Sequence, residues 1–252
     1  ALAKWGIKVL VISQYDKDKI FKIIEPKLNN SIKRGNLYKD EKETILSNIT
    51  GTTDWELSAG VDLIIESIKE DLEEKRKLFS KIYSFCPNEV IFATNTSSLK
   101  VSEIASSTER QEKFIGLHFF NPADRITLVE VVKIRQTSND TLQEILHFLK
   151  QVNKEPVVVP DIPGFILNHL LVLMINEAIE MVHKSIAPPQ DIDKIILLGA
   201  NHPIGPLALA DLIGLDTLLV ITKNLHKCFG LKYEPSKLLE EMVREGKLGK
   251  KV

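Results

Sequence analysis

Residues 61–95, VDLIIESIKEDLEEKRKLFSKIYSFCPNEVIFATN, decide the fold of this chain. Two short apolar runs, at 61–67 and 89–95, flank a stretch at 71–85 that has helical spacing and a charged outer face. Continuous apolar runs of this length indicate strands that are covered on both faces of a sheet. A strand, a helix and a second strand in this order predict a right-handed crossover between parallel strands.

The same alternation extends in both directions from this segment. Further strands are predicted at 7–13, 114–120, 127–134 and 155–160, and further helices at 16–34 and about 139–153. After Pro160 only helices are predicted, at 164–184, 189–198, 206–213, 215–229 and 235–245. Pro163 is expected in the first turn of the first of these helices. We therefore predict a Rossmann-type, doubly wound α/β domain at residues 1–160 and an all-α domain at residues 161–252.

The composition excludes several classes of protein. Of the 252 residues, 44% are hydrophobic and 27% are charged, and 33 basic and 34 acidic side chains give a net charge of -1. A chain this close to neutrality has no overall field that would attract nucleic acid or an anionic membrane. The longest apolar region, at 164–182, carries too many polar residues for a membrane-spanning helix. We expect neither a nucleic-acid partner nor a membrane partner.

The cysteines and the N-terminal segment bear on the compartment. Cys86 and Cys228 are far apart and belong to no CxxC motif or Cys/His cluster, which argues against a disulfide framework and against a metal site. The first residues, ALAKWGIKVLVIS, lack the charged segment and cleavage pattern of a signal peptide. Both observations favour the cytoplasm, and no metal is predicted.

Polar side chains follow the ends of the predicted strands, where an open α/β sheet binds its ligand. They are Ser13, Glu66, Asn95, Ser97, Ser98 and His118. The turn ATNTSSL at 93–99 provides hydroxyls and an amide that can hydrogen-bond to a polar ligand. The same turn is also typical of an ordinary helix cap, and the sequence leaves both interpretations open.

A dinucleotide-binding sheet normally begins with a strand and a GxGxxG turn whose backbone approaches the pyrophosphate. This turn does not occur in the 252 residues, and we expect it, with the first strand, to precede Ala1. Ser13 and Gln14 stand where an acidic residue normally binds the ribose hydroxyls. Ser13 is predicted to hydrogen-bond a ribose, although more weakly than a carboxylate would.

The segment GLHFFNPADRITLVEVV, residues 116–132, places a histidine and a glutamate in neighbouring apolar runs. If His118 and Glu130 touch, the carboxylate holds one ring nitrogen as a donor, and the other ring nitrogen can accept a proton. The pair would then be a general base with its orienting partner. Alternatively, His118 is a core histidine bonded to a backbone carbonyl, and Glu130 pairs with Lys133 or Arg125.

Several long motifs together resemble the L-3-hydroxyacyl-CoA dehydrogenases, including the bacterial 3-hydroxybutyryl-CoA dehydrogenases. They are ATNTSSL, GLHFFNPADRITLVEVV, DIPGFILNHLL, HPIGPLALADLIGLD and the terminal EGKLGKKV. The resemblance implies an enzyme of fatty-acid or butanoate metabolism that oxidises the 3-hydroxyl of an acyl-CoA with NAD, or catalyses the reverse reduction. It also implies a helical dimerisation domain. The helix predicted at 164–184 is apolar on more than one face, which either a second subunit or a large internal core would cover.

The resemblance further implies roles for individual residues. His118 is then the catalytic base and Glu130 its partner, and Ser97 and Asn168 bind the substrate. Together with Ser13, the residues implied to contact NAD are Glu70, Lys75, Ser97, Asn121 and Lys251. Without the resemblance, Glu70 and Lys75 are equally well explained as solvated charges on a helix.

Three features depart from the pattern of the family: the missing GxGxxG turn, Ser13 in place of the acid, and His169 where an arginine normally follows Asn168. They allow a catalytically silent relative with a structural or binding role as the alternative. A dehydrogenase of the same architecture that acts on another hydroxy acid is a further alternative. Retention of His118 and Glu130 together with the substrate-binding residues favours the active enzyme, because a silent protein does not need the complete set.

Overall fold

The computed structural model describes residues 1–14 and 16–250. The described residues divide into two compact units. We call residues 1–95 and 101–158 the sheet unit, and residues 96–100 and 159–252 the helical unit. The chain enters the helical unit after Asn95, returns to the sheet unit after Lys100, and leaves it again after Val158. The predicted domain boundaries did not include this assignment of residues 96–100 to the helical unit.

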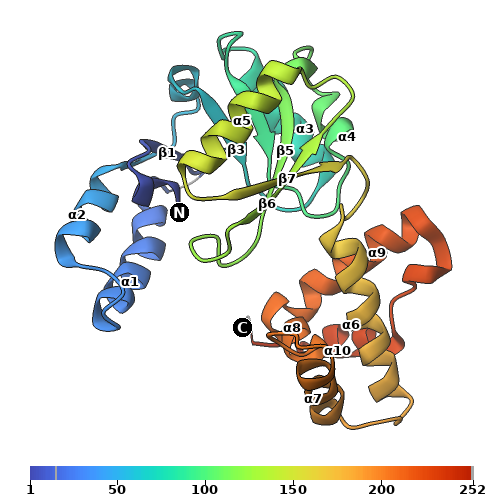
Figure 1. Ribbon diagram of the computed structural model, residues 1–252. Coiled ribbons are helices and arrows are strands. Elements are labelled where there is room, and N and C mark those ends of the chain that lie inside the picture. Colours follow the sequence, from blue (N-terminus) through green and yellow to red (C-terminus); the bar gives the residue numbers. More distant parts are fainter. Residues whose placement is uncertain (15, 251–252) are drawn as a thin grey trace. The chain divides into compact units, whose positions relative to one another are not determined.

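The strands described in the sheet unit form a small sheet and a larger one (Figure 1). In the small sheet, β1 (Val9–Ile12) and β2 (Ile49–Thr52) are parallel. The larger sheet contains β3 (Leu63–Glu66), β4 (Ile91–Thr94), β5 (Phe114–Phe119), β6 (Leu128–Lys133) and β7 (Glu155–Pro160), in that order. This mixed α/β architecture, followed by a helical unit, confirms the predicted fold class.

The direction of β6 differs from the expectation of a parallel sheet. β3, β4 and β5 are parallel to one another, whereas β6 is antiparallel to β5. β5 ends at residue 119 and β6 begins at residue 128, so that the eight residues 120–127 connect them. A parallel connection needs about a dozen residues or more. The short loop therefore forces the chain to turn back beside β5.

Helices cover both faces of the larger sheet. Those of the sheet unit are α1 (Lys19–Lys33), α2 (Lys39–Ser47), α3 (Leu72–Tyr83), α4 (Val101–Ala105) and α5 (Asn139–Gln151), with 3-10 turns at Leu2–Trp5, Glu56–Gly60 and Gln111–Lys113. Phe79 of α3 packs edge-on against Phe92 of β4 and Phe114 of β5. Ile145 and Leu149 of α5 belong to a second apolar cluster, which includes side chains of β4, β5 and β6. The α2 and β2 elements were not predicted.

The helical unit contains the helices expected after residue 160. They are α6 (Leu167–His183), α7 (Pro189–Gly199), α8 (Pro206–Ile213), α9 (Leu215–Phe229) and α10 (Lys237–Arg244), with a 3-10 turn at Gly230–Tyr233. The expected position of Pro163 was wrong, because α6 begins only at Leu167. Gly164 and Phe165 have φ angles of 76° and 48°, and this left-handed backbone cannot belong to a right-handed helix.

The helices of this unit enclose an apolar core of their own. It is formed by side chains of α6, α8, α9 and α10, among them Val172, Ile175, Ala210, Leu218, Leu225 and Leu239. Among the described residues, no helix is both long enough and apolar enough to cross a membrane.

Candidate functional site

His118 in β5 and Glu130 in β6 are direct neighbours across the antiparallel ladder. His118 Nδ1 lies 2.8 Å from Glu130 Oε2, and the two side chains are only 6% and 3% exposed. The ring of Phe120 packs on the imidazole, with 4.4 Å between the ring centroids. The sequence left open whether the histidine and the glutamate touch, and the structure shows that they do.

The alternation of side chains along the two strands decides which face carries this pair. One face forms an apolar core with α5, made of Leu117, Val129, Val131, Ile145 and Leu149 among others. Because successive residues of a strand point to opposite faces, His118 and Glu130 lie on the other face. A shift of register by one residue would move the charged pair into the apolar core. The hydrophobic pattern thus fixes the register that joins histidine to carboxylate.

The hydrogen bond also decides the tautomer of the imidazole. An ionised carboxylate can only accept hydrogen bonds, so Nδ1 of His118 must be the donor to Glu130. In the neutral ring the lone pair is then on Nε2, which is the atom that can take up a proton. Glu130 also lies close enough to stabilise the positive charge that the ring would then carry. The arrangement can act as a general base with its orienting partner.

Hydroxyl and amide side chains follow the ends of β1, β3 and β4. Ser13 comes directly after β1, and its backbone N–H donates to the carbonyl of Thr52 at 2.9 Å. Asn95, directly after β4, donates from Nδ2 to Ser67 Oγ at 3.1 Å and accepts at Oδ1 from the backbone N–H of Phe119 at 2.9 Å. Asn95 therefore joins the carboxyl ends of β3 and β4 to the end of β5, at the edge where parallel sheets bind ligands.

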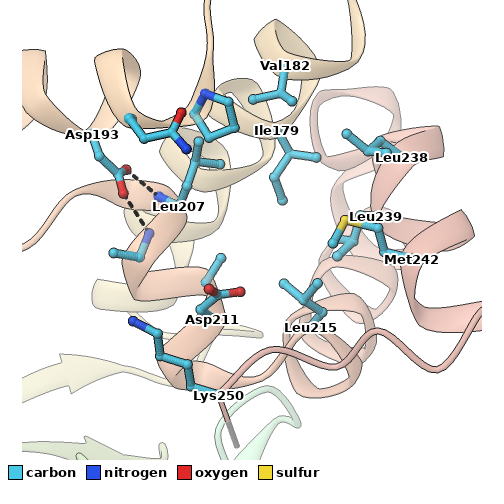
Figure 2. A pocket seen from close by; sticks show the side chains of 14 residues that line it. Ile179, Val182, Asp193, Leu207, Asp211, Leu215, Leu238, Leu239, Met242 and Lys250 are labelled. Atoms are coloured by element: carbon cyan, nitrogen blue, oxygen red, sulfur yellow. Dashed lines mark hydrogen bonds between the residues drawn. The ribbon is translucent and has the colours of Figure 1, made fainter.

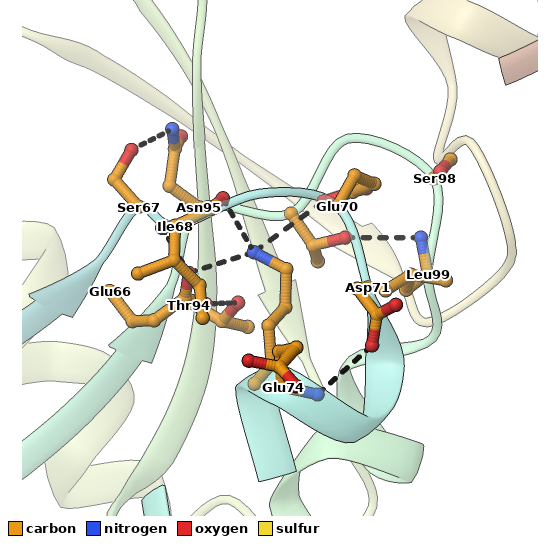
Figure 3. Close-up of polar contacts among 12 residues, drawn as sticks. Glu66, Ser67, Ile68, Glu70, Asp71, Glu74, Thr94, Asn95, Ser98 and Leu99 are labelled. Carbon is orange, nitrogen blue, oxygen red and sulfur yellow. Dashed lines mark hydrogen bonds and ion pairs between the residues drawn. The ribbon is translucent and has the colours of Figure 1, made fainter. Parts of the chain in front are cut away.

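Glu70 and Lys75 have different environments at the start of α3 (Figure 3). Lys75 is fully buried, which excludes the interpretation that it is a solvated helix charge. Its Nζ lies 2.8 Å from Glu66 Oε1 and 3.5 Å from Glu70 Oε2. The side chain of Glu70 is 22% exposed, whereas that of Glu66 is 0% exposed. Of the two predicted cofactor contacts, Glu70 is accessible to a ligand and the ammonium of Lys75 is enclosed by protein.

Ser97 and Asn168 are in contact within the helical unit. Asn168 Nδ2, on α6, donates to the backbone carbonyl of Ser97 at 2.9 Å. Asn224 Nδ2, on α9, donates to Ser98 Oγ at 2.8 Å. Two amide side chains from different helices thus anchor the segment 96–100. Asn224 was not predicted as a site residue, because it lies in a helical stretch that contains no motif.

The loop at 120–127 carries Asn121 and is supported from the sheet unit. Asn121 is exposed and lies two residues beyond β5. Lys154, only 7% exposed, donates from Nζ to the carbonyls of Ala123 and Ile126, both at 2.6 Å. Burial lowers the pKa of Lys154, and the nearby carboxylate of Asp124 partly opposes this. The role of Lys154 could not be predicted, since a single lysine between a helix and a strand forms no pattern.

The helical unit contains a cavity of about 450 Å³ (Figure 2). Its lining is mainly apolar and comes from α6, α7, α8, α9 and α10, with the carboxylates of Asp193 and Asp211 also present. The carboxylate of Asp193 caps α8, because it accepts hydrogen bonds from two backbone N–H groups in the first turn of this helix, at 2.8 and 2.9 Å. The backbone N–H of Lys250 donates to the carbonyl of Asp211 at 3.0 Å, while Lys251 lies outside the described residues. The predicted catalytic and substrate-binding residues do not line this cavity.

Comparison with protein families matches the chain in two parts. Residues 1–162 match the family model described as 3-hydroxyacyl-CoA dehydrogenase, NAD binding domain. Residues 164–252 match the model described as 3-hydroxyacyl-CoA dehydrogenase, C-terminal domain. The 3-hydroxybutyryl-CoA dehydrogenase of Clostridioides difficile is 44% identical over 235 residues, which are 93% of this chain and 84% of that protein.

Solved structures show the same similarity in three dimensions. FadB2 of M. tuberculosis superposes with a TM-score of 0.96 at 33% identity, over 99% of this chain and 89% of that chain. The (S)-3-hydroxybutyryl-CoA dehydrogenase PaaH1 from Ralstonia eutropha has a TM-score of 0.91 at 38% identity, with the same coverage of both chains.

Proposed function

Because the chain belongs to the 3-hydroxyacyl-CoA dehydrogenase family, we propose that His118 and Glu130 carry out the proton transfer of its reaction. The enzyme is an oxidoreductase that uses NAD to oxidise the 3-hydroxyl of a 3-hydroxyacyl-CoA to the ketone, or reduces the ketone in reverse. The hydrogen bond of 2.8 Å between His118 Nδ1 and Glu130 Oε2 is the observation that supports this assignment.

The polar groups of the sheet unit fit the ribose and carboxamide parts of NAD. Ser13, Ser67 and Asn95 place hydroxyl and amide groups at the carboxyl ends of parallel strands, and Glu70 adds a partly exposed carboxylate. Such groups form hydrogen bonds with sugar hydroxyls and with amides. The proposed cofactor contacts are Ser13, Glu70, Ser97, Asn121 and Lys251, and Lys75 supports Glu70.

When bound, NAD accepts the hydride that leaves C3 of the substrate. His118 takes the proton of the 3-hydroxyl at Nε2 as the C–O bond becomes a carbonyl. Glu130 keeps the other ring proton on Nδ1 and stabilises the imidazolium that results. Ser97 and Asn168 hydrogen-bond the substrate and orient its 3-oxygen. In the reductive direction, the imidazolium returns its proton to the same oxygen.

Replacement of the base tests this assignment. We expect His118→Gln to lower the turnover of acetoacetyl-CoA by roughly 10²- to 10⁴-fold, the usual contribution of a positioned acid or base. Glutamine is an uncharged polar side chain of similar size, so the thermal unfolding temperature and NADH affinity should stay close to those of the unaltered chain. NADH oxidation, thermal unfolding and NADH titration measure the three quantities.

The outcomes separate the competing functions. A His118→Gln variant with full activity would exclude His118 as the base. An unaltered chain that neither binds NADH nor oxidises it would favour a catalytically silent relative. Faster oxidation of NADH with a free keto acid than with acetoacetyl-CoA would instead indicate a different substrate class.

The exposed apolar side chains of the helical unit support a homodimer. Leu170 on α6 is 64% exposed, Ile195 and Leu198 on α7 are 65% and 76% exposed, and Leu212 on α8 is 58% exposed. Exposed apolar surface of this kind marks protein–protein interfaces, and two-fold dimers are the commonest closed assemblies. The proposed homodimer forms through this unit.

The cysteines support a reducing compartment. Cys86 is buried and Cys228 is exposed, and both are free thiols. Because free thiols are typical of cytosolic proteins, we place the enzyme in the cytoplasm.

A further inference from the structure

Glu66 is a buried carboxylate at the end of β3 to which the catalytic chemistry assigns no role. Its side chain is 0% exposed, so it cannot contact a ligand directly. Oε1 lies 2.8 Å from Lys75 Nζ and accepts a hydrogen bond from the backbone N–H of Ile68 at 2.6 Å. Oε2 accepts from Thr94 Oγ1 at 2.6 Å. Both oxygens are therefore engaged by groups of the sheet unit (Figure 3).

The contacts of Glu66 converge on the loop at 67–71, between β3 and α3. The backbone N–H of Ile68 donates to Glu66 itself, and the carbonyl of Ile68 lies 3.4 Å from Lys75 Nζ. The same ammonium lies 3.5 Å from the carboxylate of Glu70. At the far end of the loop, Asp71 caps α3 by accepting from the backbone N–H of Glu74 at 3.0 Å. Glu66 thus fixes the loop at its start and, through Lys75, at Glu70.

The charges explain why this arrangement depends on Glu66. A fully buried ammonium is strongly destabilising unless a carboxylate and hydrogen bonds compensate it. Lys75 has two carboxylates nearby, and the buried Glu66 is the closer one, at 2.8 Å against 3.5 Å for Glu70. As long as Glu66 balances Lys75, Glu70 does not have to turn inward and can keep its partial exposure. Without the charge of Glu66, the ammonium would draw Glu70 into the protein.

We propose that Glu66 is a positioning residue for cofactor binding, which holds Glu70 at the surface by taking the larger share of the charge of Lys75. This role rests on the proposed function, in which Glu70 contacts NAD. Lys75 is accordingly a part of the support beneath Glu70, and its ammonium does not itself bind the cofactor.

The variant Glu66→Gln tests the proposal, because it keeps the shape of the side chain and removes its charge. We expect NADH affinity to fall on the order of tenfold, which corresponds to the loss of one hydrogen bond to a charged group. We expect kcat at saturating NADH, and the KM for acetoacetyl-CoA, to remain close to those of the unaltered chain. Fluorescence titration with NADH and steady-state kinetics measure these quantities.

Glu74→Gln is the matched control. Glu74 is on the same helix and pairs with Lys77 at 3.5 Å, but both side chains are largely exposed, at 45% and 73%. The substitution changes the net charge by the same amount and leaves the buried cluster intact. We expect Glu74→Gln to bind NADH as tightly as the unaltered chain does, since exposed ion pairs contribute little.

A double variant tests whether the unbalanced ammonium of Lys75 is the cause of the weaker binding. In Glu66→Gln with Lys75→Met, the unpaired ammonium is removed, so thermal stability should recover relative to Glu66→Gln alone. NADH affinity should recover as well, because no ammonium remains to draw Glu70 into the protein. If stability recovers while NADH affinity stays low, the charge of Lys75 is not what displaces Glu70, and the proposal is overturned.

The failure of this proposal can be distinguished from failure of the proposed function. If the unaltered chain binds NADH and Glu66→Gln binds it equally well, only the positioning role is wrong. If the unaltered chain does not bind NADH, the proposed function is wrong and the role of Glu66 falls with it.

Discussion

Among the described residues, three basic side chains of the sheet unit are buried, and the protein compensates their positive charge in three ways. At His118, Glu130 balances the charge that appears when the ring takes up a proton. Lys75 is balanced permanently by a buried carboxylate. Lys154 donates to two backbone carbonyls of the loop at 120–127. A carbonyl carries only a partial negative charge, whereas His118 and Lys75 each have a carboxylate as partner. The positive charge of Lys154 is therefore stabilised less than a positive charge on either of the other two.

The stability of the protein should therefore depend on pH through Lys154. Burial lowers the pKa of Lys154 below its usual value of 10.5. At a pH between the lowered pKa of the folded chain and the usual pKa of 10.5, the unfolded chain binds more protons than the folded chain does. The free energy of unfolding therefore rises with pH in this range. We expect this contribution to disappear in Lys154→Met. The unaltered chain should thus gain stability relative to the variant as the pH rises toward 10.5.

Urea unfolding of both proteins from about pH 8 to about pH 10 measures the difference in the free energy of unfolding. Lys150→Met is the control, because Lys150 is an exposed lysine at the end of α5. A difference between the unaltered chain and Lys154→Met that is constant over this range, or that shrinks, would contradict the expected rise.

At the scale of elements, the proposed catalytic pair His118 and Glu130 depends on close packing of β5 against β6 and α4. Gly116 precedes His118 by two residues in β5 and pairs with Val132 of β6. A Cβ at Gly116 would lie 2.6 Å from Val101 Cγ2 and 2.7 Å from Val132 Cβ. These distances are too short, so a side chain at this position must displace α4 or β6.

We expect Gly116→Ala to destabilise the protein by about 1–3 kcal/mol, the usual cost of overpacking a core. Turnover should fall as well, because a shift of β6 moves Glu130 relative to His118. Gly60→Ala is the control, since a Cβ at Gly60 would meet no atom within 4 Å. Chemical unfolding and NADH oxidation measure both effects. Equal stability of the two variants would show that the packing around Gly116 can relax.

Most of these elements could be predicted from the sequence because their apolar patterns are regular. The helices after residue 186 and the strands β3 to β7 lie close to the predicted ranges. β2 was missed because ITGT is short and contains a glycine, which weakens the strand signal. The start of α6 was placed too early, because the rule for proline in a first helical turn does not reveal the left-handed backbone at Gly164 and Phe165.

Prediction of the site was limited by contacts between distant residues. The spacing of His118 and Glu130 allowed a hydrogen bond, but only the register of β5 and β6 determines it. The charged stretch that contains Glu70 and Lys75 looks like a solvated helix surface in the sequence. Lys75 can be buried there because it pairs with Glu66, which precedes it by nine residues and lies on the other side of a loop. Such a partner is visible only when the chain is folded.

At the scale of the whole molecule, the proposed functional residues are divided between two units that each have a core. His118 and Glu130 belong to the sheet unit, and Asn168 belongs to the helical unit. Ser97 belongs to the helical unit as well, although residues on both sides of the segment 96–100 are in the sheet unit. The amide of Asn168 therefore keeps Ser97 with the unit that is proposed to dimerise.

The proposed homodimer should depend on the exposed apolar residues of α7. We expect light scattering to give the mass of a dimer for the unaltered chain. Leu198→Asp, at the most exposed of these positions, should raise the dissociation constant by at least about tenfold, because a buried charge opposes association. Leu57→Asp is the control, because Leu57 is a 49% exposed leucine of the sheet unit. A monomeric unaltered chain, or dimers that Leu57→Asp disrupts equally, would contradict this interface.

The antiparallel return of β6 has a consequence for how such an enzyme can diversify. The proposed proton acceptor and its carboxylate are held in register by main-chain hydrogen bonds of the ladder. The distance between them therefore does not depend on the composition of the intervening loop. Mutations in the loop beyond Phe120 can therefore accumulate and alter what is recognised there, while the hydrogen bond between the imidazole and its carboxylate is inherited unchanged. Selection for new specificity and selection for reactivity thus act on separate stretches of the same hairpin.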